Sequence, residues 1–186
     1  MLLFVGLGNP SPNSENNRHN IGFKIIDAIN QKFGLSKQKP KFKGLLTTGT
    51  INGIKVYAIK PLTFMNNSGI CIRELIEYFK IEAENVIVFH DDLDIDFGKI
   101  KTKFGGSSAG HNGIESIDKF IGKDYSRVRI GIGHPKNEIE ISDHVLQDFN
   151  DEEKDELSSI TENITKSLPI LIDKKLDLFS STVNNK

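Results

Sequence analysis

Two short runs of apolar residues, 2–7 and 86–89, limit the possible folds of this chain more than any other feature. A strand with one face in water alternates apolar and polar residues, and neither run does so. Uninterrupted apolar runs of this length are typical of strands that are buried on both faces of a parallel sheet, because helices cover both sides. The chain is therefore expected to fold as an α/β protein.

The rest of the chain fits that class. Ile21, Ile25 and Ile29 recur four residues apart and predict a helix over residues 20–33. Asn52-Gly53, between two strand-like segments, is a strong hairpin signal. Further helices are predicted to begin near residue 67 and to span 114–121, and further strands to cover 100–104 and 127–132. We expect a single domain over residues 1–186, with a mixed, twisted β-sheet that includes a hairpin and is flanked by helices on both faces.

The charge is unevenly distributed along the chain, although the net charge is only −1. Residues 99–129 carry seven Lys or Arg and three acidic residues, a local charge of +4. Residues 136–186 carry six Lys and twelve Asp or Glu, a local charge of −6. This asymmetry permits a cationic face that contacts phosphate groups, with chance clustering on solvated surfaces as the alternative.

The sequence shows no sign of secretion or of a membrane span. The first residues have no basic segment, and no run approaches the roughly 20 apolar residues needed to cross a bilayer. Cys71 is the single cysteine, so it cannot form an internal disulfide and suits a reducing compartment. A cytoplasmic protein with no membrane partner is expected.

Polar residues stand where the two apolar runs end. Asp91 comes shortly after the second run, and the first run is followed by Gly8 and a polar loop that leads to His19. The carboxyl ends of neighbouring parallel strands share one crevice, so Asp91 is expected to lie beside His19. A carboxylate there would hold one imidazole tautomer and stabilise the imidazolium, which suits general-base hydrolysis. Amides that suit an uncharged polar substrate are offered by Asn9, Asn66 and Asn112. A purely structural role for His19 is the alternative.

Three other motifs lack a necessary part. Gly6-Leu7-Gly8 begins like a dinucleotide fingerprint, but the third glycine is absent and Pro10 prevents a helix start. Asp92, Asp94 and Asp96 resemble a calcium loop, but a lysine stands where the bidentate glutamate belongs. His90 has no partners at zinc-ligand spacing. Neither a metal site nor a cofactor is predicted.

Ser108 lies in Gly106-Ser107-Ser108-Ala109-Gly110, which matches the nucleophile elbow of serine hydrolases. That elbow follows a buried parallel strand, whereas the preceding segment alternates with lysines as an edge strand does. A flexible loop is the better interpretation, and a serine hydrolase remains an alternative.

Six segments in order together resemble the bacterial-type peptidyl-tRNA hydrolases. They span nearly the whole chain and are Val5-Gly6-Leu7-Gly8-Asn9-Pro10, Arg18-His19-Asn20-Ile21-Gly22-Phe23, Lys60-Pro61-Leu62-Thr63-Phe64-Met65-Asn66-Asn67-Ser68-Gly69, His90-Asp91-Asp92-Leu93-Asp94, Gly110-His111-Asn112-Gly113 and Arg127-Val128-Arg129-Ile130-Gly131-Ile132-Gly133-His134-Pro135.

The resemblance implies cleavage of the ester that joins a peptide to the 3′ ribose of tRNA, which recycles the tRNA. It implies that His19 is the general base and that Asp91 stabilises and orients it. Asn9 corresponds to the residue that distinguishes a blocked from a free amino group. An RNA-binding protein of the same fold that has lost its chemistry is the alternative, and the presence of both His19 and Asp91 speaks against it.

The resemblance also implies a binding surface for peptidyl-tRNA, through its 3′ CCA end, acceptor stem and 5′ phosphate. Lys103 and Arg129 correspond to a pair that clamps the 5′ phosphate. The positions that correspond to contacts with the 3′ end and the peptide are Phe64, Asn66 and Asn112. His111 corresponds to a histidine of the family in the same loop as Asn112 and is placed with the substrate-binding residues. A monomer without a metal or cofactor is expected.

The loop after the first strand departs from the family pattern. Ser11 replaces the usual glycine, Ser14 a tyrosine and Asn17 a threonine. The tyrosine normally helps to hold the tRNA end, so its role is not assigned to Ser14.

Overall fold

The strands of residues 1–185, the part of the chain that the computed structural model describes, form one sheet in the order β2-β3-β4-β1-β5-β7-β6. The four strands β4, β1, β5 and β7 are parallel, and β2, β3 and β6 are antiparallel to their neighbours. The strands are β1 (Leu2–Gly6), β2 (Lys39–Lys41), β3 (Gly44–Ile51), β4 (Ile54–Pro61), β5 (Val86–Asp92), β6 (Ile100–Phe104) and β7 (Ser126–Gly131).

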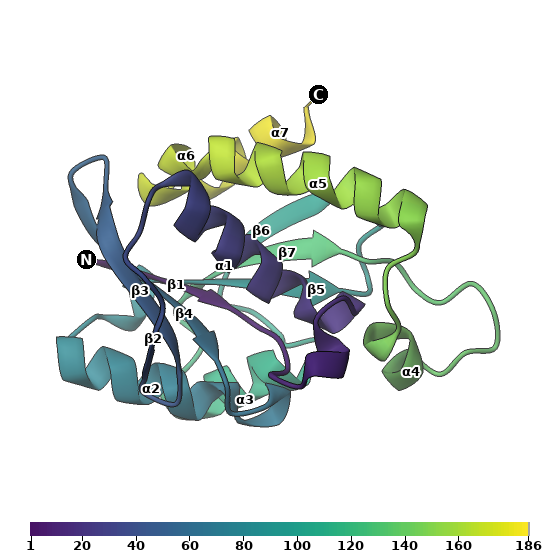
Figure 1. Cartoon of the computed structure of the whole chain (residues 1–186), viewed down its shortest axis with the longest axis horizontal. Coiled ribbons are helices and arrows are strands. Elements are labelled where there is room, and N and C mark those ends of the chain that lie inside the picture. Colours follow the sequence, from purple (N-terminus) through teal and green to yellow (C-terminus); the bar gives the residue numbers. More distant parts are fainter. Residues whose placement is uncertain (186) are drawn as a thin grey trace.

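Helices cover both faces of this sheet. In Figure 1, α2 and α3 lie on one face, while α1, α5, α6 and α7 lie on the other. The α-helices are α1 (Ile21–Lys32), α2 (Ser68–Phe79), α3 (Asn112–Ile121), α4 (Ile141–Leu146), α5 (Asp151–Lys166), α6 (Leu168–Ile172) and α7 (Leu176–Asn184). The short 3-10 helices are η1 (Pro12–Ser14), η2 (Arg18–Asn20), η3 (Met65–Asn67) and η4 (Ala83–Asn85).

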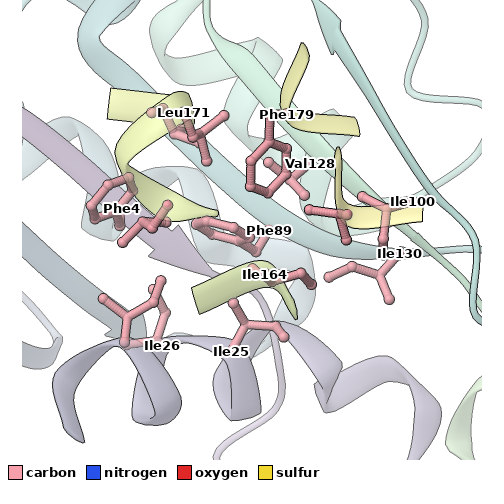
Figure 2. Packing of buried hydrophobic residues seen from close by; sticks show 14 of the residues in the cluster. Phe4, Ile25, Ile26, Phe89, Ile100, Val128, Ile130, Ile164, Leu171 and Phe179 are labelled. Carbon is pink, nitrogen blue, oxygen red and sulfur yellow. The ribbon is translucent and has the colours of Figure 1, made fainter. Parts of the chain in front are cut away.

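The apolar runs belong to strands that serve two cores. In β1, Leu2 and Phe4 enter the core beneath α1, α5, α6 and α7, whereas Leu3 and Val5 enter the core beneath α2 and α3. Phe4 lies against Phe89 of β5 in the first core, with their ring centroids 5.9 Å apart (Figure 2). Both faces of β1 and β5 therefore exclude water, which explains why their residues do not alternate.

The predicted hairpin joins β3 to β4. Asn52 has φ +49° and Gly53 has φ +78°. Two successive residues with positive φ are the signature of the tight turn that matches the twist of paired strands, and Asn-Gly adopts it at low cost. The hairpin extends the parallel centre of the sheet with antiparallel strands on one side.

Two glycines bring α1 onto the sheet. A Cβ atom on Gly6 would lie 2.2 Å from the carbonyl oxygen of Gly22, and one on Gly22 would lie 2.4 Å from the backbone nitrogen of Leu7. Neither position can hold a larger residue without moving backbone. The first turn of α1 therefore contacts β1 directly, and η2, just before it, lies against β5.

The predicted α/β fold, with a mixed sheet, a hairpin and helices on both faces, is confirmed. Several predicted boundaries shift by one or two residues, and β5 continues through His90 and Asp91 to Asp92 while it pairs with β7. No helix within residues 1–185 is long and apolar enough to cross a membrane.

Candidate active site

A buried carboxylate at the end of β5 lies between two histidines. The Asp91 side chain is 2% exposed, and its Oδ2 lies 2.8 Å from Nδ1 of His19. Its Oδ1 lies 2.8 Å from Nε2 of His111. His19 belongs to η2 and His111 precedes α3, so three distant segments of the chain meet at this carboxylate. The predicted contact between His19 and Asp91 is present.

The hydrogen bonds of His111 determine its tautomer. Its Nδ1 accepts hydrogen bonds from the backbone N–H groups of Gly113 and Ile114, at 3.1 and 3.3 Å, and so caps the N-terminus of α3. A nitrogen that accepts two N–H groups carries no proton, so Nε2 is protonated and donates to Asp91. His111 thus uses both of its ring nitrogens within the protein.

His19 has the complementary arrangement. Its Nδ1–H donates to Asp91, which leaves the lone pair of Nε2 available. No group within residues 1–185 forms a hydrogen bond with that Nε2. An imidazole oriented through one nitrogen and open at the other is the geometry that general-base chemistry requires.

The electrostatics of the pair follow from burial and mutual charge. Burial alone would lower the pKa of His19, but the charge of Asp91 and its hydrogen bond outweigh burial and raise that pKa above its usual value. Burial alone would raise the pKa of Asp91, but the two histidines hold it well below its usual range. Asp91 is therefore ionised at neutral pH and stabilises a proton on His19.

His90 supports the cluster without taking part in it. Its Nδ1–H donates to the backbone oxygen of Asp91 at 2.8 Å, and its ring lies 5.0 Å from that of His111. Burial, followed by the charge of His111, lowers the pKa of His90 to about 3. This histidine is uncharged at neutral pH, and its Nε2 has no partner in the described part of the chain.

The amide of Asn9 is held in one orientation. The Met65 N–H donates to Oδ1 of Asn9 at 2.8 Å, and Asn20 forms two 2.9 Å hydrogen bonds with the Asn9 backbone. Because Oδ1 accepts a backbone N–H, the NH₂ group of Asn9 is the part left to donate to a ligand. Asn20, which adjoins His19, was not predicted to have this role.

Phe64 is exposed in a strained backbone conformation. Its φ and ψ are +62° and 157°, a region that non-glycine residues rarely occupy, and 59% of the residue is exposed. The Phe64 side chain is not stabilised by burial, and its backbone conformation is unfavourable for a residue with a Cβ atom. Strained residues of this kind are typical of ligand-binding sites. Asn66, two residues on in η3, is exposed as well.

Two adjoining cavities form an open cleft around His19. One has a volume of about 380 Å³ and reaches Asp91, His111 and Ser108. The other, of about 460 Å³, is lined by Asn9, Ser11, Ser14, Phe64 and Asn66 among others. Both cavities are lined by His19, Asn112, Ser142 and Val145. The predicted residues Asn9, Phe64, Asn66, His111 and Asn112 are thus brought to one cleft.

The sequence reasoning missed the contribution of α4. Ser142 and Val145 of this helix line both cavities, and α4 contacts η2, beside which it stands in Figure 1. The helix has six residues in an acidic, polar part of the chain. No local pattern distinguishes it from an ordinary surface helix.

The predicted phosphate-binding cations lie on β6 and β7. Nζ of Lys103 donates to the carbonyl oxygen of Ser107 at 2.9 Å, and Nε of Arg129 donates to Oδ2 of Asp92 at 2.9 Å. Burial, then the charges of Arg129 and Arg127, lower the pKa of Lys103. Arg127 was counted with the basic face, but it is 1% exposed and forms an ion pair with Asp118 of α3. The solvated cationic patch is therefore smaller than the sequence suggested.

Ser108 does not have the environment of a nucleophile. The preceding strand, β6, is an antiparallel edge strand. The Ser108 hydroxyl has a 3.4 Å hydrogen bond to Glu115, and no histidine of residues 1–185 is bonded to it. Ser108 therefore lacks the parallel strand and the histidine partner that a nucleophile elbow requires.

A metal ion could use the same three side chains as the hydrogen-bonded cluster. Ligand atoms of His19, Asp91 and His111 all lie within 4.8 Å of one another. The nitrogens that face Asp91 carry the protons of its two hydrogen bonds, so a metal would have to displace both protons. The two imidazoles and the carboxylate are therefore arranged for the two hydrogen bonds to Asp91, not for a metal ion between them.

The fold and site define a class of protein: an α/β protein with a carboxylate-oriented histidine in an open cleft. The sequence profile of the family described as peptidyl-tRNA hydrolase matches residues 3–186, and the chain belongs to that family. A peptidyl-tRNA hydrolase of Pelagibacter ubique is 80% identical over 186 residues, which is the full length of both chains.

More distant relatives agree in sequence and in structure. A peptidyl-tRNA hydrolase of Ehrlichia canis is 46% identical over 185 residues, which cover 98% of this chain and 94% of the relative. The crystal structure of peptidyl-tRNA hydrolase from Acinetobacter baumannii superposes with a TM-score of 0.92 at 33% identity, covering 100% of this chain and 95% of the other.

Proposed function

We propose that this protein hydrolyses the ester between an N-blocked aminoacyl or peptidyl group and the 3′ end of tRNA. The reaction frees the tRNA for reuse, and the protein acts as a cytoplasmic monomer. Family membership supports the activity. The observation that supports the mechanism is the 2.8 Å contact between His19 and Asp91, which leaves Nε2 of His19 open to the cleft.

The first step is attack by water on the ester carbonyl. Nε2 of His19 takes a proton from the water while the oxygen forms a bond to the carbonyl carbon, and Asp91 stabilises the imidazolium. The carbonyl oxygen becomes an oxyanion. Asn9, Asn66 and Asn112 line the same cleft, and their NH₂ groups are candidate donors to the oxyanion or to the peptide.

The second step expels the ribose oxygen. The tetrahedral intermediate collapses, the carbon–oxygen bond to the 3′ oxygen breaks, and the imidazolium returns its proton to that oxygen. The products are a free tRNA hydroxyl and a carboxylic acid. His111 does not need to move a proton here, because both of its nitrogens are already engaged. It is better described as a positioning residue than as a substrate contact.

The remaining groups bind the tRNA. The exposed ring of Phe64 offers a surface on which a terminal base can stack. Lys103 and Arg129 bind the 5′ phosphate in this proposal, and each must exchange its present partner for the phosphate. Because Ser14 lines the cavity where the family has a tyrosine, Phe64 is the main aromatic contact available to the 3′ end.

The test compares two substrates that differ only in the amino group. Release of tRNA is measured from N-acetyl-aminoacyl-tRNA and from the same aminoacyl-tRNA without the acetyl group. We expect fast release from the blocked substrate and slow release from the free one. Equal rates would overturn the assignment of Asn9, and no release from the blocked substrate would overturn the proposed reaction. Labelling by a fluorophosphonate that is lost in Ser108→Ala would favour a serine hydrolase instead.

A further inference from the structure

The most deeply buried cation within residues 1–185 plays no part in the proposed reaction. Arg127 of β7 is 1% exposed, so it cannot touch a substrate. Its Nη2 donates to Oδ1 of Asp118 in α3 at 2.9 Å, and its Nη1 donates to the carbonyl oxygen of Ser107 at 2.8 Å. The Tyr125 hydroxyl donates to the same oxygen of Asp118 at 2.8 Å. Arg127 thus ties a loop to both the sheet and α3.

One carbonyl oxygen connects this buried group to the predicted phosphate site. The oxygen of Ser107 accepts from Arg127 and also from Nζ of Lys103, at 2.9 Å. Lys103 lies directly opposite Arg127 in the pairing of β6 with β7, so both side chains project from the same face of the sheet. The position of the Lys103 ammonium therefore depends on where Arg127 holds Ser107.

The same loop leads to the catalytic cluster. The loop has positive φ at Gly105, Gly106, Ala109 and Gly110. Because glycine tolerates many backbone conformations, the conformation of this loop depends on contacts with the rest of the protein. The His111 N–H donates to the carbonyl oxygen of Ser108 at 3.0 Å, and the His111 ring donates to Asp91. A displacement of Ser107 would be passed to His111 and Asn112 within a few residues.

We propose that Arg127 is a positioning residue that acts through the Ser107 carbonyl. It aims Lys103 at the substrate phosphate and holds the loop that places His111 and Asn112. The inference rests on the proposed function, because it needs a substrate with a phosphate and an ester. An ion pair that served only the fold would stabilise the protein without changing its response to the phosphate.

The test measures how much the 5′ phosphate accelerates the reaction. kcat/KM is determined for N-acetyl-aminoacyl-tRNA with and without its 5′ phosphate, and the ratio is the phosphate factor. In the wild type we expect a factor of about tenfold, as for one charge-assisted hydrogen bond. Lys103→Met should reduce the factor to the part that Arg129 alone supplies.

The decisive variant is Arg127→Met, with Tyr125→Phe as its matched control. Tyr125→Phe removes one donor from Asp118 but keeps both bonds of Arg127, so its phosphate factor should equal that of the wild type. Arg127→Met should reduce the phosphate factor as Lys103→Met does. It should also lower kcat on the substrate without the phosphate, because His111 and Asn112 follow the loop that Arg127 holds. Circular dichroism reports whether each variant folds.

A second variant covers the case in which Arg127→Met does not fold. Arg127→Lys keeps a cation beside Asp118, but one ammonium cannot hold both Asp118 and Ser107 as the guanidinium does. It should show the same loss of the phosphate factor. A folded variant of either kind with a wild-type factor overturns the inference, and so does a wild type that cleaves both substrates equally well. A wild type that cleaves neither contradicts the proposed function and the inference together.

Discussion

The Asp91 cluster and the cations of β6 and β7 use their polar groups in opposite ways. Asp91 is buried, and each of its oxygens accepts a hydrogen bond from a histidine that the proposed mechanism keeps in place. Lys103 and Arg129 are partly exposed and bonded to Ser107 and Asp92, partners that a phosphate would replace. The first region is organised before the substrate arrives, whereas the second must exchange contacts.

This difference predicts where substitutions act. Groups that keep their partners throughout the reaction need little reorganisation energy when charge develops in the transition state. Their loss should therefore lower kcat. Cations that exchange one partner for another contribute only the difference between the two contacts, so their loss should appear in KM and in the salt dependence. The predictions below test that contrast, from the largest expected effect to the smallest.

His19→Ala should have the largest effect. Loss of the general base should lower kcat by roughly 10²- to 10⁴-fold, with little change in tRNA binding or in the unfolding transition. Single-turnover cleavage and a binding assay on the same samples separate the two. Lys55→Ala, which removes an exposed side chain of β4 outside the cleft, is the control. A His19→Ala enzyme that keeps most of its activity would exclude the proposed mechanism.

Asp91→Asn should lower kcat by roughly 10²-fold and also change the pH profile. Only neutral His19 can accept a proton, so kcat/KM of the wild type should fall as the pH drops through the pKa of His19. That pKa is raised, so the fall should begin on the alkaline side of the usual histidine value. The amide has no charge to raise the pKa, so the acidic limb should move to lower pH. An unmoved limb would show that another group titrates.

The double variant Lys103→Met and Arg129→Met should raise KM by roughly tenfold and leave kcat nearly unchanged. Each lost phosphate contact should also flatten the plot of log affinity against log salt by roughly 0.7 to 0.9. The matched control is Lys37→Met with Lys55→Met, which removes the same charge from exposed positions outside the cleft. Equal salt slopes in the two double variants would refute the phosphate clamp.

Phe64 shares a feature with each region. Its backbone is already fixed in a strained conformation, as the Asp91 cluster is fixed, but its side chain gains a partner only when the tRNA end binds. Phe64→Gly and Phe64→Ala should both raise KM, by roughly tenfold, because a stacking surface is lost. Phe64→Gly should be more stable than Phe64→Ala by about 1 kcal/mol, since φ of +62° favours glycine. Thermal unfolding measures that difference. The reverse order of stability would show that the backbone relaxes without the ring.

Treatment with EDTA should leave the hydrolytic activity unchanged. The hydrogen bonds of Asp91 to His19 and His111 leave the protons, not a metal, between these groups. Activity is measured before and after prolonged chelation and dialysis. Activity that is lost and then restored by Zn²⁺ would assign the cluster to metal binding.

Most of the scaffold was readable from local patterns. The apolar run of β1 predicts a doubly buried strand because each of its residues meets one of two cores. Asn52-Gly53 predicts its hairpin because few other pairs adopt two positive φ values cheaply. These signals are local, since a strand or a turn displays its needs in consecutive residues.

The roles of individual site residues were less readable. The resemblance places His111 among the substrate-binding residues, and the structure adds that it is the N-cap of α3 and a donor to Asp91, which no local pattern indicates. Arg127 and Arg129 alternate in the same way along β7 and face the same side of the sheet, yet Arg127 is buried and paired with Asp118 whereas Arg129 is partly exposed. The share of α4 in the cleft had no signal in its own residues.

By itself, the amino-acid sequence determined the α/β architecture and the meeting of His19 with Asp91, because parallel strands that are buried on both faces must end at a common edge. The tertiary structure alone decided which cations remain in water, which histidine has a free nitrogen and which helix borders the cleft. Those outcomes depend on contacts between residues far apart in the chain, and no short stretch of sequence records its distant neighbours.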